Sequence, residues 1–195
     1  GLEFRRVLFR SELGWQQSRQ LGQYWQAKGQ VFDRVILGTL RRHDETWRGI
    51  AQGLGVDPKA WAVERNAKLN EYDSEAIIGT VHQGDLQRPD TPAMYRHHFK
   101  LLRQGLRLWM DGQTQPKGMP SYAMFRAGIQ DVLAGISALG TGRVLVVSSG
   151  GPIATAVGLV LQAPAVATID LNFHLRNSSV SELSHHPKGQ RLISF

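Results

Sequence analysis

The spacing of apolar side chains along the chain predicts helices that alternate with short strands. A helical period of three to four residues recurs in five segments, which are 12–28, 40–54, 91–110, 121–139 and 153–161. Runs rich in Val and Ile, typical of buried strands, are 32–37 and 143–148. Further strands are expected near 165–169, 173–183 and 191–195, whereas 56–90 and 111–120 are polar and irregular. This alternation favours an α/β fold with a mostly parallel sheet that helices cover on both faces.

Composition and charge exclude several classes of protein. The chain has 195 residues, of which 42% are hydrophobic, and both values suit one globular domain. No apolar run approaches the ~20 residues of a membrane helix, so we expect no membrane partner. The net charge of +7 is scattered along the chain, and we therefore expect no nucleic-acid partner. The absence of cysteine excludes disulfides and thiolate zinc sites and favours a cytoplasmic location.

Residues 1–11 differ in character from the rest of the chain. Glu3-Phe4 is what an in-frame EcoRI site encodes, and the run resembles a translated cloning adaptor. We therefore predict a non-native leader at 1–11 and a single domain at 12–195. A natural basic strand is the alternative, because Val7-Leu8-Phe9 has strand character.

Two turns that follow predicted strands carry candidate chemistry. In the segment 148–152, Ser-Ser-Gly-Gly-Pro, glycine lets the backbone turn sharply and proline begins a helix whose N-terminus attracts anions. A plain strand-to-helix turn, which needs glycine for packing, is the alternative. Arg42, near the start of the helix after 32–37, can bind a phosphate through two N–H groups. Its alternative is a solvated arginine beside Asp44 and Glu45.

Six blocks of the sequence, in order over residues 11–184, resemble the histidine phosphatase superfamily, to which the phosphoglycerate mutases belong. The blocks are Ser11–Gly22 (family pattern L-S/T-x-x-G-x-x-Q-A-x-x-L-G), Phe32–Val35 with Leu40–Thr46 (F-D-x-V and L-x-R-x-x-x-T), Leu69–Glu71 (L-x-E), Ser121–Arg126 (S-x-x-x-F-x-x-R, with the arginine displaced), Val146–Ile153 (V-V-S-H-G-G-x-I) and Asn177–Val180 (N-x-S-V). The resemblance implies a three-layer α/β/α fold like that of phosphoglycerate mutase.

The resemblance also implies a phosphoryl-transfer enzyme that acts on a small phosphorylated molecule. Family members hydrolyse or transfer phosphomonoesters through a phosphohistidine, without a metal or other cofactor. Carried over by motif, Arg42 binds the phosphate and Gly150 contributes a backbone N–H to the pocket. Glu71 is the acid that protonates the leaving oxygen and then the base that activates water. Ser149 stands where the family has a second catalytic histidine.

Two departures from the family pattern bear on activity. The Arg-His-Gly motif that carries the nucleophilic histidine does not occur in the chain, so we expect a domain that lacks its first strand and is inactive or nearly so. Ser149 offers a neutral hydrogen bond of roughly 0.5–1.5 kcal/mol where a charged imidazolium gives roughly 1.5–3. That difference corresponds to about one to two powers of ten in rate.

Two other functions stay open at this point. A non-catalytic phospholigand-binding relative would keep Arg42 and the glycine turn and would explain both departures. A serine hydrolase would use Ser149 as nucleophile, with Asp170 and His174 or His185 downstream, although Val147 stands where that motif needs glycine. The remaining histidine pairs, at 97–98 and 185–186, are interpreted as surface residues.

Overall fold

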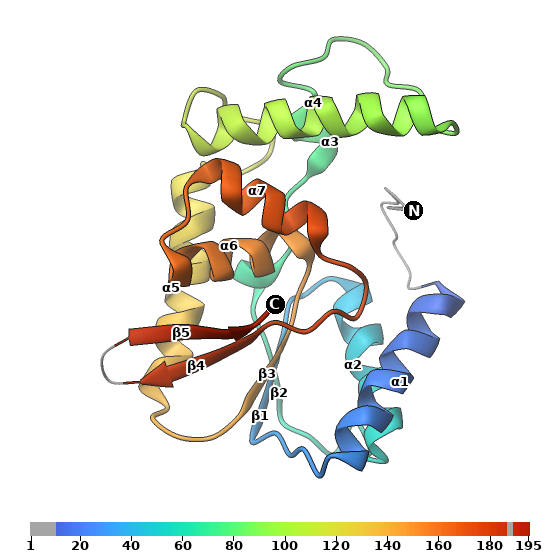
Figure 1. The fold of residues 1–195 in the computed structure, drawn as a ribbon, viewed down its shortest axis with the longest axis vertical. Helices are drawn as coiled ribbons and strands as arrows, with labels where there is room; N and C mark the ends of the chain where they lie inside the picture. Colours follow the sequence, from blue (N-terminus) through green and yellow to red (C-terminus); the bar gives the residue numbers. More distant parts are fainter. Residues whose placement is uncertain (1–10, 187–188) are drawn as a thin grey trace.

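The computed structural model describes residues 11–186 and 189–195 (Figure 1). In chain order its helices and strands are α1 Glu12–Ala27, β1 Arg34–Leu37, α2 Arg41–Leu54, β2 Val63–Arg65, the 3-10 helix η1 Ala67–Leu69, α3 Ser74–Ile78, α4 Pro92–Met110, α5 Tyr122–Ala138, β3 Val144–Val147, α6 Gly150–Leu161, α7 Ala165–His174, β4 Glu182–His186 and β5 Gly189–Ser194. Within the described ranges, no helix combines the length and apolar character needed to cross a membrane.

The central sheet has three parallel strands in the order β2-β1-β3. Val35 of β1 lies opposite Val63 of β2 and Leu145 of β3, so β1 is paired on both sides. Because the strands are parallel, all three end at the same edge of the sheet. Within the described residues, β3 has one paired neighbour, β1.

Side chains that alternate along β1 fill two separate cores. Val35 and Leu37 are fully buried and pack with Trp47 of α2 and Trp25 of α1. Ile36 points to the opposite face, and its cluster includes α5 side chains. Since helices cover both faces, the predicted three-layer α/β/α fold is confirmed.

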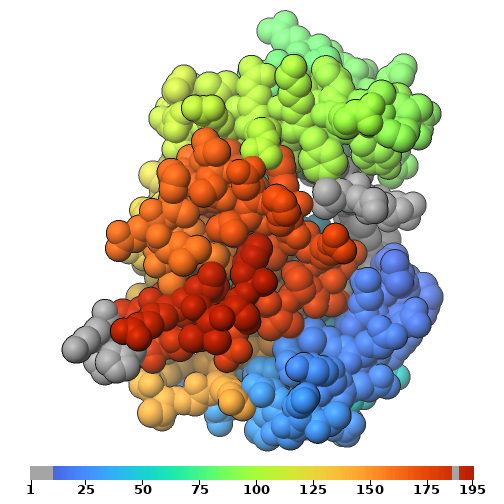
Figure 2. Space-filling view, in the orientation of Figure 1, coloured from blue at the N-terminus to red at the C-terminus, as the bar shows by residue number. Residues whose placement is uncertain are grey.

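A third apolar cluster has all of its buried members on helices. It joins α3, α4 and α7 around the fully buried Trp109, and its other buried members are Ile77, Ile78, Leu102, Leu106 and Ile169. Figure 1 shows α4 across one end of the molecule, away from α1 and α2, with α7 between α4 and the sheet. In the space-filling view of Figure 2, α7 and the β4–β5 hairpin lie over the middle of the face that is turned to the reader, with α4 above them and the N-terminal helices below.

The strands expected after residue 164 are wrong in part. Residues 165–169 form the first half of α7 instead of a strand, and Pro164 provides the N-cap. The strand expected at 173–183 is replaced by the end of α7 and a connection that turns at Asn177 and Ser178, and β4 begins only at Glu182. A short apolar run fits a buried helix as well as a strand, which explains the first error. The last predicted strand, 191–195, corresponds to β5, which pairs with β4 in a separate antiparallel hairpin.

The polar stretch 56–90 contains more regular structure than predicted. It holds β2, η1 and α3, and each is five residues or shorter, too short to show a period in the sequence. The two helix ends with the strongest signals are confirmed. Thr91 caps α4 ahead of Pro92, and Gly55 ends α2 in a left-handed conformation with φ +74°.

The predicted leader at 1–11 lies outside the described residues, except for Ser11. The hydroxyl of Ser11 caps α1 by accepting the Gly14 N–H at 3.1 Å.

Candidate active site

The carboxyl edge of the parallel sheet brings three connections together. Thr39, after β1, donates its N–H to the side chain of Asn70 at 2.7 Å, and the Asn70 amide donates to the Thr39 hydroxyl at 2.6 Å. Ser148, after β3, donates its hydroxyl to the carbonyl of Leu69 at 2.7 Å. These bonds tie the segment before Glu71 to the turns after the other two strands, where ligands of parallel α/β proteins bind.

Arg42 and Ser149 meet at this edge, although 107 residues separate them in the sequence. Arg42 is the second residue of α2, and its guanidinium donates to the Ser149 hydroxyl from Nη2 at 2.8 Å and from Nε at 3.2 Å. Ser149 is the N-cap of α6 and is 9% exposed. The guanidinium therefore faces the glycine turn, and the two candidates that the sequence placed on separate turns form one cluster.

His43 is a third member of this cluster. Its Nε2 lies 2.7 Å from the Ser149 hydroxyl oxygen, and its side chain is 1% exposed. The hydroxyl oxygen of Ser149 thus contacts three nitrogen atoms, two from Arg42 and one from His43.

The Glu71 side chain lies against the N-terminal end of α6, where the first backbone N–H groups have no partners within the helix. Gly151 donates its N–H to both carboxyl oxygens of Glu71 at 3.2 Å, and the Tyr72 N–H donates to one of them at 3.2 Å. Burial raises the pKa of the Glu71 carboxyl above its ordinary value, although the Gly151 N–H, the charge of Arg42 and the Tyr72 N–H all act in the opposite direction. A raised pKa keeps more of the carboxyl protonated near neutral pH, as a general acid requires.

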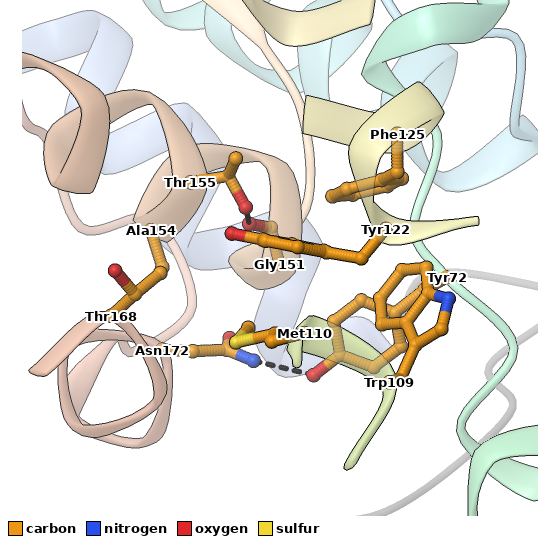
Figure 3. A pocket seen from close by; sticks show the side chains of 10 residues that line it. All are labelled: Tyr72, Trp109, Met110, Tyr122, Phe125, Gly151, Ala154, Thr155, Thr168 and Asn172. Atoms are coloured by element: carbon orange, nitrogen blue, oxygen red, sulfur yellow. Dashed lines mark hydrogen bonds between the residues drawn. The ribbon is translucent and has the colours of Figure 1, made fainter. Parts of the chain in front are cut away.

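Tyr72 and Asn172 lie next to Glu71 and are bonded to each other, as the dashed line between their side chains in Figure 3 shows. The Asn172 amide donates to the Tyr72 hydroxyl, and the Tyr72 ring packs edge-on against Trp109, with ring centres 5.9 Å apart. Burial raises the pKa of Tyr72 well above its ordinary value, and the nearby Glu71 carboxyl adds to this effect. The cavity between these side chains and α6 has a volume of about 10 Å³, the lower limit for one water molecule. This region is packing that supports the site, because it has no room for a substrate.

An open groove of about 690 Å³ lies elsewhere, between the loop after α4, the start of α5 and the loop before α7. None of the predicted site residues lines it. Its volume is that of a ligand site, but its lining has only two charged side chains, those of Asp111 and Arg126.

The structure brings all four predicted site residues, Arg42, Glu71, Ser149 and Gly150, to one corner. Gly150 is the first residue of α6, and a Cβ built on it would lie 2.6 Å from the Asn172 side chain and 3.9 Å from Glu71. The catalytic and binding roles assigned to these residues stay predictions.

Four further residues of this corner were not identified from the sequence, namely His43, Tyr72, Gly151 and Asn172. For His43 a signal existed. It lies four and seven residues before Trp47 and Ile50, so it shares their buried helix face, where a histidine needs a partner.

The contacts of Ser149 differ from those that the serine-hydrolase hypothesis requires. The Asp170 carboxylate forms an ion pair with Arg103 at 2.7 Å, and His174 Nδ1 lies 2.7 Å from the carbonyl of Asp170. The imidazole at the Ser149 hydroxyl is instead that of His43.

A protein-family comparison identifies this architecture. The model of the histidine phosphatase superfamily (branch 1) matches residues 11–195, and the chain therefore belongs to that superfamily. A search of curated protein sequences found no significant match.

Solved structures of phosphatases and mutases share the fold. A mycobacterial glucosyl-3-phosphoglycerate phosphatase, in complex with VO3, is 21% identical with a TM-score of 0.63, over 95% of this chain and 85% of that one. Phosphoserine phosphatase of Entamoeba histolytica, in complex with 3-phosphoglyceric acid, is 19% identical with a TM-score of 0.64, over 95% and 82%. A phosphoglycerate mutase of Bacillus anthracis is 17% identical with a TM-score of 0.62, over 95% and 80%.

Proposed function

We propose that the chain carries the phosphate-binding and acid/base groups of a phosphomonoesterase, acting on a small phosphorylated molecule. One observation supports this proposal above the others. The Arg42 guanidinium and the Glu71 carboxyl, which lie far apart in the sequence, converge on the first residues of α6. A cation, a helix N-terminus and a carboxyl of raised pKa are what phosphoryl transfer needs around one phosphorus atom.

Each group has a separate part in the reaction. Arg42 binds phosphoryl oxygens and stabilises the negative charge that they carry in the transition state. The Ser149 hydroxyl and the N–H of Gly150 supply neutral hydrogen bonds to the same oxygens. In the phosphohistidine route, a nucleophilic histidine takes the phosphoryl group while protonated Glu71 donates its proton to the departing alcohol oxygen. Glu71, now a carboxylate, then removes a proton from the water that attacks the phosphohistidine.

The phosphohistidine route requires a nucleophile from an Arg-His-Gly motif, which the 195 residues do not contain. We therefore propose that this chain binds phosphomonoesters and turns them over slowly or not at all. Hydrolysis of p-nitrophenyl phosphate at mildly acidic pH measures turnover. Rapid turnover with no phosphohistidine trapped would contradict this part of the proposal.

Binding of orthovanadate, a phosphate analogue, tests the site by itself. Replacing Arg42 by alanine removes both charge-assisted bonds, and isothermal titration should show an affinity about ten- to a hundredfold weaker. Arg48→Ala, on the same helix but paired with Asp44 at the surface, is the matched control and should bind as the wild type does. The proposal is wrong if the wild type binds no orthovanadate, or if Arg42→Ala binds it equally well.

A non-catalytic phospholigand-binding protein is the second candidate, and Ser149 at the histidine position favours it. In a non-catalytic protein, the Glu71 carboxyl would take no part in a proton transfer. Single-turnover experiments with enzyme in excess distinguish the two candidates, because only an enzyme should release inorganic phosphate, at a rate that falls in Glu71→Gln.

A further inference from the structure

We assign the hydrogen bonds around Ser149 from the donors and acceptors that each side chain carries. Arginine has donors and no acceptor, so Arg42 Nη2 and Nε both donate to lone pairs of the serine oxygen. In the His43 tautomer that carries its proton on Nδ1, the serine hydroxyl donates its proton to Nε2, 2.7 Å away. Ser149 is therefore held between a guanidinium that donates and an imidazole that accepts.

His43 is held in place from its other side as well. A Cβ built on Gly38, in the turn after β1, would lie 2.1 Å from His43 Nδ1 and 2.5 Å from Cε1. The glycine backbone thus passes directly against the ring edge, and the 1% exposed ring has little freedom to turn away from Ser149. Gly38, in the turn after β1, therefore holds the His43 ring, and the turn after β3 holds Ser149. Together they keep His43 Nε2 and Ser149 Oγ at hydrogen-bonding distance.

We propose that His43 supplies the imidazole of the phosphate site from helix α2, acting through the hydroxyl of Ser149. This inference rests on the proposed function. When a phosphoryl oxygen takes the N–H groups of Arg42, the serine lone pairs are released. The Ser149 hydroxyl keeps its proton and donates it in a hydrogen bond to the phosphoryl oxygen. His43 takes up a proton at Nε2 from the surrounding water and donates this new N–H to the freed lone pair of the serine oxygen. His43 is thus a positioning residue, and Ser149 is the group that touches the phosphate.

The hydrogen bond between His43 and Ser149 explains why a phosphate site can have serine at position 149. A hydroxyl alone is a weak donor, but hydrogen bonds in a chain polarise one another, so a serine that accepts from an imidazole donates more strongly. The imidazole is contributed by position 43 in place of position 149. Exchanging the two side chains should therefore preserve the function of the pair, whereas removing the imidazole should not.

Orthovanadate binding to the whole chain, by isothermal titration, tests this exchange. His43→Ser should weaken the affinity about tenfold, the value of one charge-assisted hydrogen bond. The double variant His43→Ser with Ser149→His contains the same atoms as the wild type and should restore the affinity to within about threefold. His185→Ser, on the exposed face of β4, makes the same chemical change elsewhere and should leave binding unchanged.

Two results would overturn the inference. One is a folded His43→Ser protein, checked by circular dichroism, that binds orthovanadate as tightly as the wild type. The other is a folded double variant that still binds as weakly as His43→Ser, because position 43 would then have only a structural role.

Nitrogen-15 NMR of the wild-type histidines gives an independent measurement if the double variant does not fold. On addition of orthovanadate, the His43 Nε2 resonance should change from that of an acceptor nitrogen to that of a protonated one. An unchanged resonance at saturating orthovanadate contradicts the inference.

The same titrations separate this inference from the function on which it rests. Failure of the wild type to bind orthovanadate, or unchanged binding by Arg42→Ala, counts against the phosphate site itself. Loss of binding in Arg42→Ala together with full binding in His43→Ser leaves the site in place and rejects only the role of His43.

Discussion

The two sides of the active-site corner are built in different ways. On the Ser149 side, side chains from α2 bond to a side chain at the start of α6, and no backbone group takes part in the three contacts. On the Glu71 side, backbone N–H groups of Gly151 and Tyr72 hold the carboxyl, and aromatic rings pack behind it.

The difference indicates that the two sides of the corner have separate functions. Side-chain hydrogen bonds can be exchanged for bonds to a ligand without moving the backbone, so the Ser149 side suits binding. A carboxyl that is fixed by backbone groups and packed against Tyr72 keeps one position, as proton transfer requires. Substitutions on the Glu71 side should therefore change folding stability, and those on the Ser149 side should change ligand affinity.

The largest expected effect is on the Glu71 side, at Gly151. A Cβ there would lie 2.2 Å from Glu71 Oε1 and 2.4 Å from a carbon of the Tyr72 ring, and neither neighbour can move freely. Gly151→Ala should lower the free energy of unfolding by about 1–3 kcal/mol, measured by urea denaturation. Gly135→Ala, in the last turn of α5 with open space around the new methyl group, should instead raise it by up to about 1 kcal/mol. Equal stabilisation by both substitutions would show that Gly151 is not tightly packed.

On the Ser149 side, Arg42→Lys should weaken orthovanadate binding about tenfold and leave stability nearly unchanged. Lysine keeps the charge but loses the pair of N–H groups that the guanidinium presents in a fixed plane. Titration calorimetry measures the affinity, and Arg48→Lys on the exposed face of the same helix should bind normally. If Arg42→Lys binds as tightly as the wild type, the charge alone matters and the fork geometry does not.

A smaller loss of stability is expected from Asn172→Ala. It removes the hydrogen bond to the Tyr72 hydroxyl and should lower the free energy of unfolding by about 1 kcal/mol. Orthovanadate affinity should stay within about twofold of the wild type, because Tyr72 contacts the site through Glu71. Asn177→Ala, an exposed asparagine in the connection after α7, is the control for stability. A large loss of affinity with unchanged stability would place Asn172 on the ligand side.

The subtlest expected change is in the pH dependence of stability, tested by Glu71→Gln. Because the folded-state pKa of Glu71 is raised above 4.5, the folded protein favours the protonated carboxyl. The stabilisation from this proton is complete below pH 4.5 and is lost as the pH rises through the folded-state pKa. Glutamine is neutral at every pH, so Glu71→Gln should gain stability relative to the wild type as the pH rises above that range. Thermal melts between pH 4 and 8 measure the difference, and Glu64→Gln, at an exposed position on β2, is the control variant.

The parts of the fold that the sequence predicts have a clear period or a strong end signal. The helix at Arg41–Leu54 combines apolar spacing with Gly55, and the strand at Val144–Val147 lies in a run of β-branched residues. The strand expected at 165–169 fails because its short apolar run fits the buried side of α7 equally well. Strand β2, three residues long and mostly polar, is recognisable only once it pairs with β1.

The residues of the candidate site also divide into those that the sequence predicts and those that it does not. Arg42, Glu71, Ser149 and Gly150 follow from motif resemblance and from their places after strands, where parallel sheets gather ligand sites. His43 does not follow, because its partner Ser149 lies 106 residues away and no local pattern joins them. Gly151 is missed for a related reason, since the choice between two adjacent glycines depends on the direction of one N–H group toward Glu71.

The central position of β1 has a consequence for the folding of this molecule. Every turn of the active-site corner follows a strand that is either β1 or hydrogen-bonded to it, and the β1–β3 register joins Arg34 to Val144 across most of the chain. Such long-range pairing closes a large loop and forms slowly compared with local helices. The capacity to hold an oxyanion should therefore emerge in the last kinetic phase of refolding, well after α1 and α2 have acquired their helical signal.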